Sequence, residues 1–306
     1  MNKSYFILTG LVLAMLVLSA CDDSGNDGSS RSNPFRTGTQ SLLLSYENDR
    51  PPREVFADMQ FDVSVRIQNT GEYDIPANSL SVSLQGFNHE TYGLTQARQT
   101  VGREMIGTHF DVDRNIIQGD EEYVVFGPLR YNADLSVTLF GVPIQAVVCY
   151  PYGTRVESNL CIKRNPHQDN PGDVCKGNEQ KSTFVSSAPV QVTPIRQTPR
   201  SNGLAFTFDV VHNGNGEIYG LPSEYCEGRE EKNKILVEIN GPEGISCGLL
   251  GGTNSGVITL GSSGSQITCS LDTSAATSDY VQEISINLKY NYRQQMTEVI
   301  DIKPVN

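Results

Sequence analysis

Apolar and polar residues alternate in short stretches along most of the chain. The clearest stretch is "MQFDVSVRIQNTG" (59–71), in which polar or small residues separate Phe61, Val63, Val65 and Ile67. A period of two places these four side chains on one face of an extended strand, and the Asn-Thr-Gly that follows is typical of a turn. The pattern predicts a half-buried β-strand.

Similar stretches of strand length recur, separated by Gly, Pro, Asn and Asp. The last of them is long and alternates cleanly, which predicts a central strand with Ile284, Ile286 and Leu288 facing inward. Short strands at this spacing are typical of β-sandwiches. The further predicted strands are 79–87, 122–131, 135–150, 155–162, 234–241, 256–261, 265–272 and 281–293.

The first strand pattern occurs a second time, in "GLAFTFDVVHNGNGEIYG" (203–220). Phe206, Phe208, Val210 and His212 repeat the earlier strand at an offset of 145 residues, and Gly216 repeats Gly71. This offset is far longer than the period of about 20 to 50 residues that solenoids use. The repeat therefore predicts an all-β chain of two related antiparallel β-sandwich domains, residues 41–187 and 188–306.

The N-terminus has the pattern of an export signal. Lys3 precedes an apolar stretch, 5–18, that is short for a membrane span of about 20 residues but suits the core of a signal peptide. The sequence "LSAC", ending at Cys21, resembles the lipobox of bacterial-type lipoproteins. That resemblance implies removal of residues 1–20, lipid attachment to Cys21 and retention on the outer face of the cytoplasmic membrane.

Residues 21–40 are rich in Ser, Gly, Asn and Asp. Such a composition buries too little apolar surface to offset the entropy of ordering, so it predicts a disordered tether.

Six cysteines follow Cys21, and an even number in an exported chain indicates disulfides. Pairs that close short loops are Cys161 with Cys175 and Cys247 with Cys269, which leaves Cys149 and Cys226 either paired with each other or free. Sequence alone does not choose among the possible connectivities. A zinc site is the competing interpretation, but the chain has no Cys-x-x-Cys pair.

The overall charge narrows the range of partners. The chain carries a formal net charge of −12, which repels nucleic-acid phosphates and favours solubility. We therefore expect no nucleic-acid partner. The candidate partners are the membrane, through a lipid on Cys21, and other envelope or surface proteins or glycans.

One loop has the spacing of a calcium site. In "DVDRNIIQGDEE" (111–122), Asp111, Asp113, Asn115 and Glu122 fall at ligand positions of the twelve-residue calcium loop. The sixth position, however, is Ile116, where that loop requires Gly for its turn. The alternative is an acidic, solvated β-loop, and we expect no other cofactor.

Other chemistry is weakly marked. The four histidines lie in no recognisable catalytic motif, so the sequence favours a non-catalytic protein. Tyr92, Tyr150, Tyr152 and Tyr225 are candidates for stacking on sugars if they are exposed, although tyrosines in turns also cover sandwich cores.

The strand, Asn-x-Gly and strand arrangement at the start of both predicted domains resembles the Ig-like modules of the cell-adhesion-related (CARDB) type in bacterial and archaeal surface proteins. That resemblance implies tandem Ig-like sandwiches and a structural, adhesive or partner-binding role at the cell surface. The alternatives are an extracytoplasmic hydrolase acting on glycans, and an adhesin stabilised by calcium.

Overall fold

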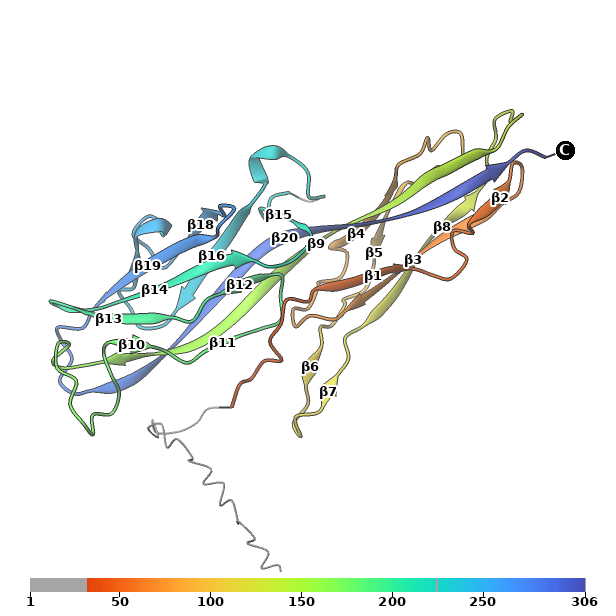
Figure 1. Ribbon diagram of the computed structural model, residues 1–306. Helices are drawn as coiled ribbons and strands as arrows, with labels where there is room; N and C mark the ends of the chain where they lie inside the picture. The colour runs from red at the N-terminus through yellow and green to blue at the C-terminus, as the bar shows by residue number, and fades with distance from the viewer. Residues whose placement is uncertain (1–31, 224, 306) are drawn as a thin grey trace, which may run out of the picture. The chain divides into compact units, whose positions relative to one another are not determined.

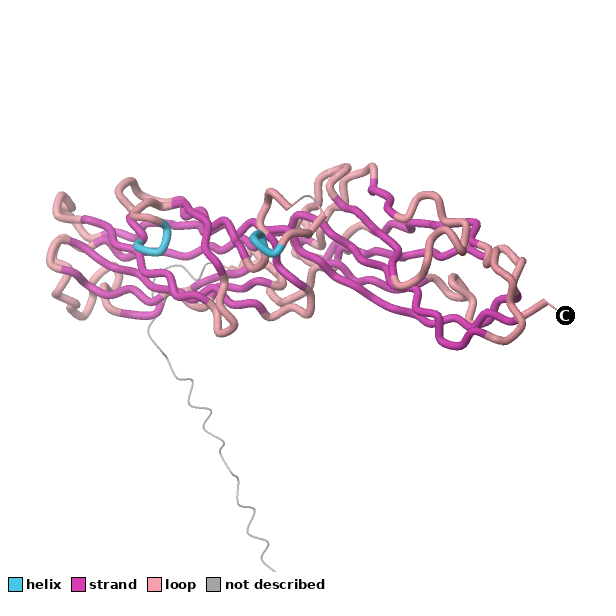
Figure 2. The backbone as a smooth tube through the Cα atoms, turned by 90° about the horizontal axis from the view of Figure 1, so that it is seen from above, coloured by secondary structure: helices cyan, strands magenta, loops and turns pink. Residues whose placement is uncertain are grey.

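The computed structural model describes residues 32–223 and 225–305, and their backbone is mainly β-strand (Figure 1). Their helices are two short 3-10 turns, η1 (Arg229–Glu231) and η2 (Gly248–Leu250), which Figure 2 shows in cyan. Neither has the length and apolar character that crossing a bilayer requires. The predicted all-β class is confirmed.

The strands of the N-terminal part form what we name the first lobe. A three-stranded antiparallel sheet in the order β1-β3-β8 lies on one side of its core. The strands that begin in this lobe are β1 (Leu42–Tyr46), β2 (Glu54–Phe56), β3 (Phe61–Asn69), β4 (Leu80–Gln85), β5 (Arg98–Val101), β6 (His109–Phe110), β7 (Ile116–Ile117), β8 (Glu121–Leu129) and the long β9 (Leu139–Ile162).

The remaining strands form the second lobe. Its outer sheet has the order β10-β13-β14-β19-β17, with β12 paired to β14. Its strands are β10 (Glu179–Gln180), β11 (Thr183–Val185), β12 (Val190–Val192), β13 (Arg196–Arg200), β14 (Gly203–His212), β15 (Glu217–Tyr219), β16 (Lys234–Asn240), β17 (Ser246–Cys247), β18 (Ser255–Thr259), β19 (Ser265–Asp272) and the long β20 (Tyr280–Lys303).

The two long strands β9 and β20 belong to both lobes. They pair antiparallel from Tyr280 opposite Ile162 to Ile302 opposite Leu139 (Figure 1). One nine-stranded sheet, with the path β18-β16-β20-β9-β4-β5, therefore backs both sandwiches. The boundary predicted between residues 187 and 188 does not separate two sheets, because β9 leaves the first lobe to enter the second and β20 returns.

The continuity of β9 also corrects the prediction of separate strands at 135–150 and 155–162. Pro151, which lies between the two predicted strands, is a turn signal in the sequence, but it and Pro143 both lie inside the strand. They flank the segment that pairs with β4, which runs from Gln145 to Cys149. Neither proline therefore has to donate a hydrogen bond to β4, which is how a strand tolerates proline.

The alternating patterns locate the core correctly. Phe61, Val63, Val65 and Ile67 are buried on β3, and their counterparts Phe206, Phe208 and Val210 are buried on β14. The inward residues of β20 predicted from the sequence, Ile284, Ile286 and Leu288, are buried as well. The side chains of both lobes join one continuous apolar cluster.

The second half of the predicted tether contacts the folded part. The amide of Arg36 donates to the Glu72 carboxylate over 2.9 Å, and Gly38 accepts from the amide of Ala188 over 3.2 Å. The compact unit accordingly begins at Ser32 rather than at residue 41. Composition alone missed this segment because its order comes from hydrogen bonds to distant loops and not from apolar burial.

Candidate functional site

Four tyrosines lie where β9 and β20 pass from one lobe to the other. Tyr150 is opposite Tyr292, and Tyr152 is opposite Tyr290. All four side chains are fully buried, and neighbouring rings meet edge to face. Edge-to-face pairs are the arrangement that the ring quadrupoles favour. Because the sequence places Tyr-x-Tyr on both long strands, this cluster forms directly from their register.

The tyrosine hydroxyls connect the shared strands to both lobes. Tyr150 donates to Ser41 over 3.0 Å, next to β1. Tyr292 accepts from the amide of Gly216 over 2.7 Å and lies 3.0 Å from Nε2 of His212, in the second lobe. Burial raises the pKa of Tyr292 to about 12 and lowers the pKa of His212. Both groups are therefore neutral at physiological pH and serve as hydrogen-bonding partners.

A groove of about 670 Å³ lies beside this cluster. Its lining comes from the chain around β1 (39–44), the turn before β15 (214–217) and the middle of β20 (292–296), with Thr70 and Pro189. Ligand sites on proteins commonly fall in the range of about 300 to 1,000 Å³. We take this groove as our candidate site.

The groove runs past a part of β20 that lacks a neighbour on one side. One edge of β20 pairs with β9 along its whole length. On the opposite edge β16 pairs as far as Lys289, β15 covers 291–293 and β2 covers 301–303. No strand of the described chain pairs with this edge between Gln294 and Ile300.

The side chains of β20 show the same gap. Even-numbered positions are buried from Ile284 to Tyr292 and again at Ile300 and Ile302. Between these segments Gln294 and Met296 are only partly buried and Glu298 is exposed. The core therefore covers β20 only in part where the groove passes it.

Charged side chains line one end of the groove. Glu217 forms ion pairs with Lys232 over 2.6 Å and with Arg293 over 3.3 Å. The hydrogen bond from Lys232 is the main cause that lowers the pKa of Glu217. Glu217 is consequently ionised and paired at neutral pH, which does not suit the general acid of a glycosidase.

Three disulfides hold the surrounding frame. Cys161 pairs with Cys175, Cys247 pairs with Cys269, and Cys149 pairs with Cys226. The last pair ties β9 to the loop after β15, at a sequence separation of 77 residues. Cys161–Cys175 and Cys247–Cys269 are the pairings expected from short-loop closure, and of the two alternatives left open for Cys149 and Cys226 the structure has the paired one. Three disulfides indicate an oxidising, extracytoplasmic environment.

The loop that carries Cys226 is also fixed to β5. Arg98 lies over the ring of Tyr225, 4.1 Å from its centroid, and forms an ion pair with Glu227 over 2.7 Å. Tyr225 is thus engaged by a cation rather than left open.

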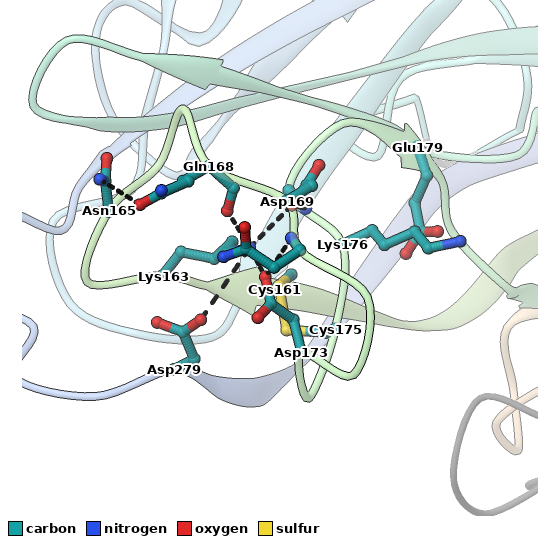
Figure 3. A network of polar contacts seen from close by, with 12 residues as sticks. Cys161, Lys163, Asn165, Gln168, Asp169, Asp173, Cys175, Lys176, Glu179 and Asp279 are labelled. Carbon is teal, nitrogen blue, oxygen red and sulfur yellow. Dashed lines mark hydrogen bonds and ion pairs between the residues drawn. A yellow bond between two sulfur atoms is a disulfide. The ribbon is translucent and has the colours of Figure 1, made fainter.

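A second polar cluster closes the loop between Cys161 and Cys175 (Figure 3). Lys163, whose side chain is only 3% exposed, pairs with Asp169 over 2.8 Å and with Asp173 over 2.6 Å. Asp279, just before β20, is 4.0 Å from the same ammonium. Burial by itself lowers the pKa of Lys163, but the hydrogen bonds to the two aspartates outweigh it and raise the pKa. The cluster fixes this loop to the second lobe.

The predicted calcium residues do not converge. Asp111 accepts hydrogen bonds from the amides of Asp113 and Asn115 and from the Asn115 side chain, and so closes the β6–β7 hairpin turn. Glu122 lies on β8 and pairs with Arg103 over 2.5 Å. Within residues 32–223 and 225–305, no three His, Cys, Asp or Glu side chains gather as metal ligands do.

The predicted sugar-stacking tyrosines are mostly inaccessible. Tyr92, Tyr150 and Tyr152 are buried, because their rings pack inside the core rather than at its surface. Cys21, the predicted lipid attachment site, and residues 1–20 lie outside the described residues.

Sequence reasoning missed the groove. Its signal in the sequence is the run "QQMTEV" (294–299), where Gln294 and Glu298 take inward positions that are apolar earlier in the final strand. The Tyr-x-Tyr motifs on β9 and β20 mark the neighbouring cluster and were equally visible.

Comparisons with known proteins do not assign the chain to a family. No protein-family model and no curated protein matches the sequence significantly. Among solved structures, it is similar to a secreted serine protease, VesC from Vibrio cholerae, at 8% identity and a TM-score of 0.18, over 86% of this chain and 52% of that one. It is also similar to the collagen adhesin CNA from S. aureus, at 13% identity and a TM-score of 0.11, over 90% and 96% of the two chains.

Proposed function

We propose that the protein is a lipid-anchored module of the cell surface that binds a partner in the groove between β1 and β20, without catalysing a reaction. The observation that carries the proposal is the uncovered stretch of β20 beside the groove. Loops and edges held by a rigid frame are where β-sandwich proteins carry their binding functions.

Two further features support the location. Three disulfides fit an exported chain, and the apolar N-terminal stretch followed by "LSAC" fits a lipid anchor on Cys21.

The anchor is tested by intact mass spectrometry of the protein extracted from its own membranes. We expect a chain that lacks residues 1–20, carries lipid on Cys21 and has six protected cysteines until reduction. An unlipidated chain would refute the anchor, and free thiols would refute the oxidising compartment.

Partner binding is tested by a photo-crosslinking amino acid placed at Leu43, which is 51% exposed on β1 and lines the groove. The matched control is Val257, which is 59% exposed on β18 in the second lobe. Irradiation of intact cells should give a discrete adduct from position 43 and none from position 257. Equal labelling from both positions, or no adduct from position 43, would contradict partner binding in the groove.

A further inference from the structure

The backbone groups on the uncovered edge of β20 point away from β9. The amide of Asp301 donates to Arg53 over 2.8 Å on the side of β2, opposite to β9. Peptide groups alternate in direction along a strand. Those of Gln295, Thr297 and Val299 therefore face the same side as Asp301, but without a neighbouring strand.

In the three-stranded sheet, side chains occupy backbone groups of the edge strand β8. On β8 the carbonyl of Val125 accepts from the side chain of Gln99 over 2.7 Å, and the carbonyl of Glu121 accepts from Arg103. Side chains that occupy edge groups are a common protection against unwanted pairing. No described side chain donates to the backbone of Gln295, Thr297 or Val299, so this edge remains available.

We propose that the groove accepts an extended peptide segment of a partner protein, which adds as a β-strand to the edge of β20 between β15 and β2. The inference rests on the proposed partner-binding role and names the partner's chemistry. Residues 294–300 offer a span of about 23 Å at roughly 3.3 Å per residue. Strand addition obtains affinity from main-chain hydrogen bonds and specificity from alternate side chains.

A carboxylate on the uncovered part of β20, next to the groove, indicates the charge of one of those alternate side chains. Glu298 has the same parity as Tyr292 and Ile300, so its side chain points to the face of the sheet that the groove exposes. The Tyr46 hydroxyl donates to the carbonyl of Met296 over 3.4 Å, which places the part of β20 two residues before Glu298 beside β1. Glu298 has no ion-pair partner among the described residues. A Lys or Arg on the peptide complements it.

Exposed apolar side chains next to the edge of β20 can contact the other alternate side chains of the added peptide. Leu43 on β1 and Val299 on β20 are 51% and 52% exposed. The expected ligand is therefore an extended segment with β-branched residues and one basic residue, in contrast to a helix or a folded surface.

The test is selection from a random dodecapeptide phage library on the protein purified from its membranes. Enriched peptides should be rich in Val, Ile and Thr and carry a conserved Lys or Arg. Their affinities are then measured as synthetic peptides by fluorescence polarisation. The variant Thr297→Pro removes one edge amide that β9 does not use, and it should weaken binding at least tenfold. Ser255→Pro on the remote edge strand β18 is the control for a proline at a sheet edge.

The charge is tested separately. Glu298→Lys should reverse the selected residue from basic to acidic, while Glu283→Lys, an exposed site distant in the strand, should not. Failure to enrich any peptide, or enrichment unaffected by Thr297→Pro, overturns the inference. Sedimentation of the free protein tests whether a second copy of the chain is the occupant. A dimer that is abolished by Thr297→Pro means that a second copy fills the groove.

These results are distinguishable from failure of the proposed function. Peptide selection on the purified protein combined with no adduct from position 43 in cells supports the strand-accepting edge and refutes its use at the cell surface. An adduct in cells with no selected peptide supports partner binding and refutes an extended peptide as the partner.

Discussion

Tyr150 on β9 lies directly opposite Tyr292 on β20, with 6.1 Å between the ring centroids. The hydroxyl of Tyr150 reaches Ser41 beside β1, and that of Tyr292 reaches Gly216 and His212 in the second lobe. One cross-strand pair therefore joins the hydrogen bonding of both lobes. Because both strands continue through both lobes, the pair also couples the groove to the second sandwich.

The first prediction concerns the Tyr292 hydroxyl. Tyr292→Phe keeps the ring but leaves the amide of Gly216 and the ring of His212 without their partner. Loss of one partner from a buried hydrogen bond costs about 1 to 3 kcal/mol, so the free energy of unfolding should fall by about that amount. Chemical denaturation measures it, with Tyr280→Phe at an exposed position of the same strand as the control. Equal stabilities of the two variants would contradict this role.

The second prediction ranks two disulfides. Cys149–Cys226 closes a segment of 77 residues and Cys161–Cys175 closes one of 14. In the chain-entropy treatment the longer loop contributes about 4.5 kcal/mol and the shorter about 3 kcal/mol. Replacing both cysteines of each pair by alanine should lower the unfolding midpoint more for the pair 149 and 226. Denaturation of the two double variants under the same conditions measures both midpoints. A lower midpoint for the pair 161 and 175 would show that native-state strain or residual structure in the unfolded state outweighs loop entropy.

Local alternation predicted most of the strands, because the buried and exposed faces of a half-buried strand appear directly as alternating apolar and polar residues. Phe61 to Ile67 and Phe206 to Val210 needed no information from the rest of the chain. The sharing of β9 and β20 was different. It pairs segments more than 100 residues apart, and Pro151 and Gly153 suggested a turn within β9 where the long-range pairing with β20 keeps the strand straight through. Tertiary pairing outweighed the local turn signal.

The groove was harder still to foresee. It exists because β15 pairs with β20 only as far as Arg293, and β2 pairs with it only from Asp301 onward. A missing neighbour leaves only a polar run in the sequence, and such runs also occur in ordinary solvated strands. The residues of the calcium spacing show a related effect: Asp111 and Glu122 are close in sequence, but a hairpin turn and a strand direct them to different partners.

The third prediction concerns the pH dependence of the Lys163 cluster. Hydrogen bonds from the amides of Gly177 and Asn170, together with Lys163, hold the pKa values of Asp169 and Asp173 below the usual range, against the effect of burial. A lowered pKa in the folded state contributes stability above the unfolded value, about 3.9, which is lost as the pH falls through the folded value. The raised pKa of Lys163 contributes stability that is present below about 10.4 and is lost as the pH rises through the folded value.

Lys163→Met should therefore flatten the dependence of unfolding free energy on pH below about 4 and above about 10.4, where the lysine and its aspartates titrate. It should also speed protease cleavage between Cys161 and Cys175, because the loop loses its central cation. Lys289→Met, which removes a partly exposed pair with Glu238, is the control for the cleavage rate and for the pH profile below about 4. Parallel pH profiles for Lys163→Met and the unaltered protein would contradict the assignment.

The last prediction explains the repeat between the two entry strands. Gly71 and Gly216 occupy equivalent turns 145 residues apart, and each lies against a tyrosine of the shared strands. A Cβ on Gly71 would meet the Tyr152 hydroxyl at 1.9 Å, and one on Gly216 would meet the Tyr292 ring at 2.8 Å. Overpacking of this kind costs about 1 to 3 kcal/mol, so Gly71→Ala and Gly216→Ala should each lower the free energy of unfolding by at least that much.

Gly102→Ala is the matched control, because its Cβ would have no neighbour closer than 3.9 Å. It should leave stability within about 0.5 kcal/mol of the unaltered protein. If Gly71→Ala were as mild as this control, the turn would not be fixed against Tyr152, and the repeat would follow only from strand alternation. If both turn variants are severe, the repeat reflects a shared requirement: in each lobe a turn must approach the tyrosines of β9 and β20 without a side chain between them.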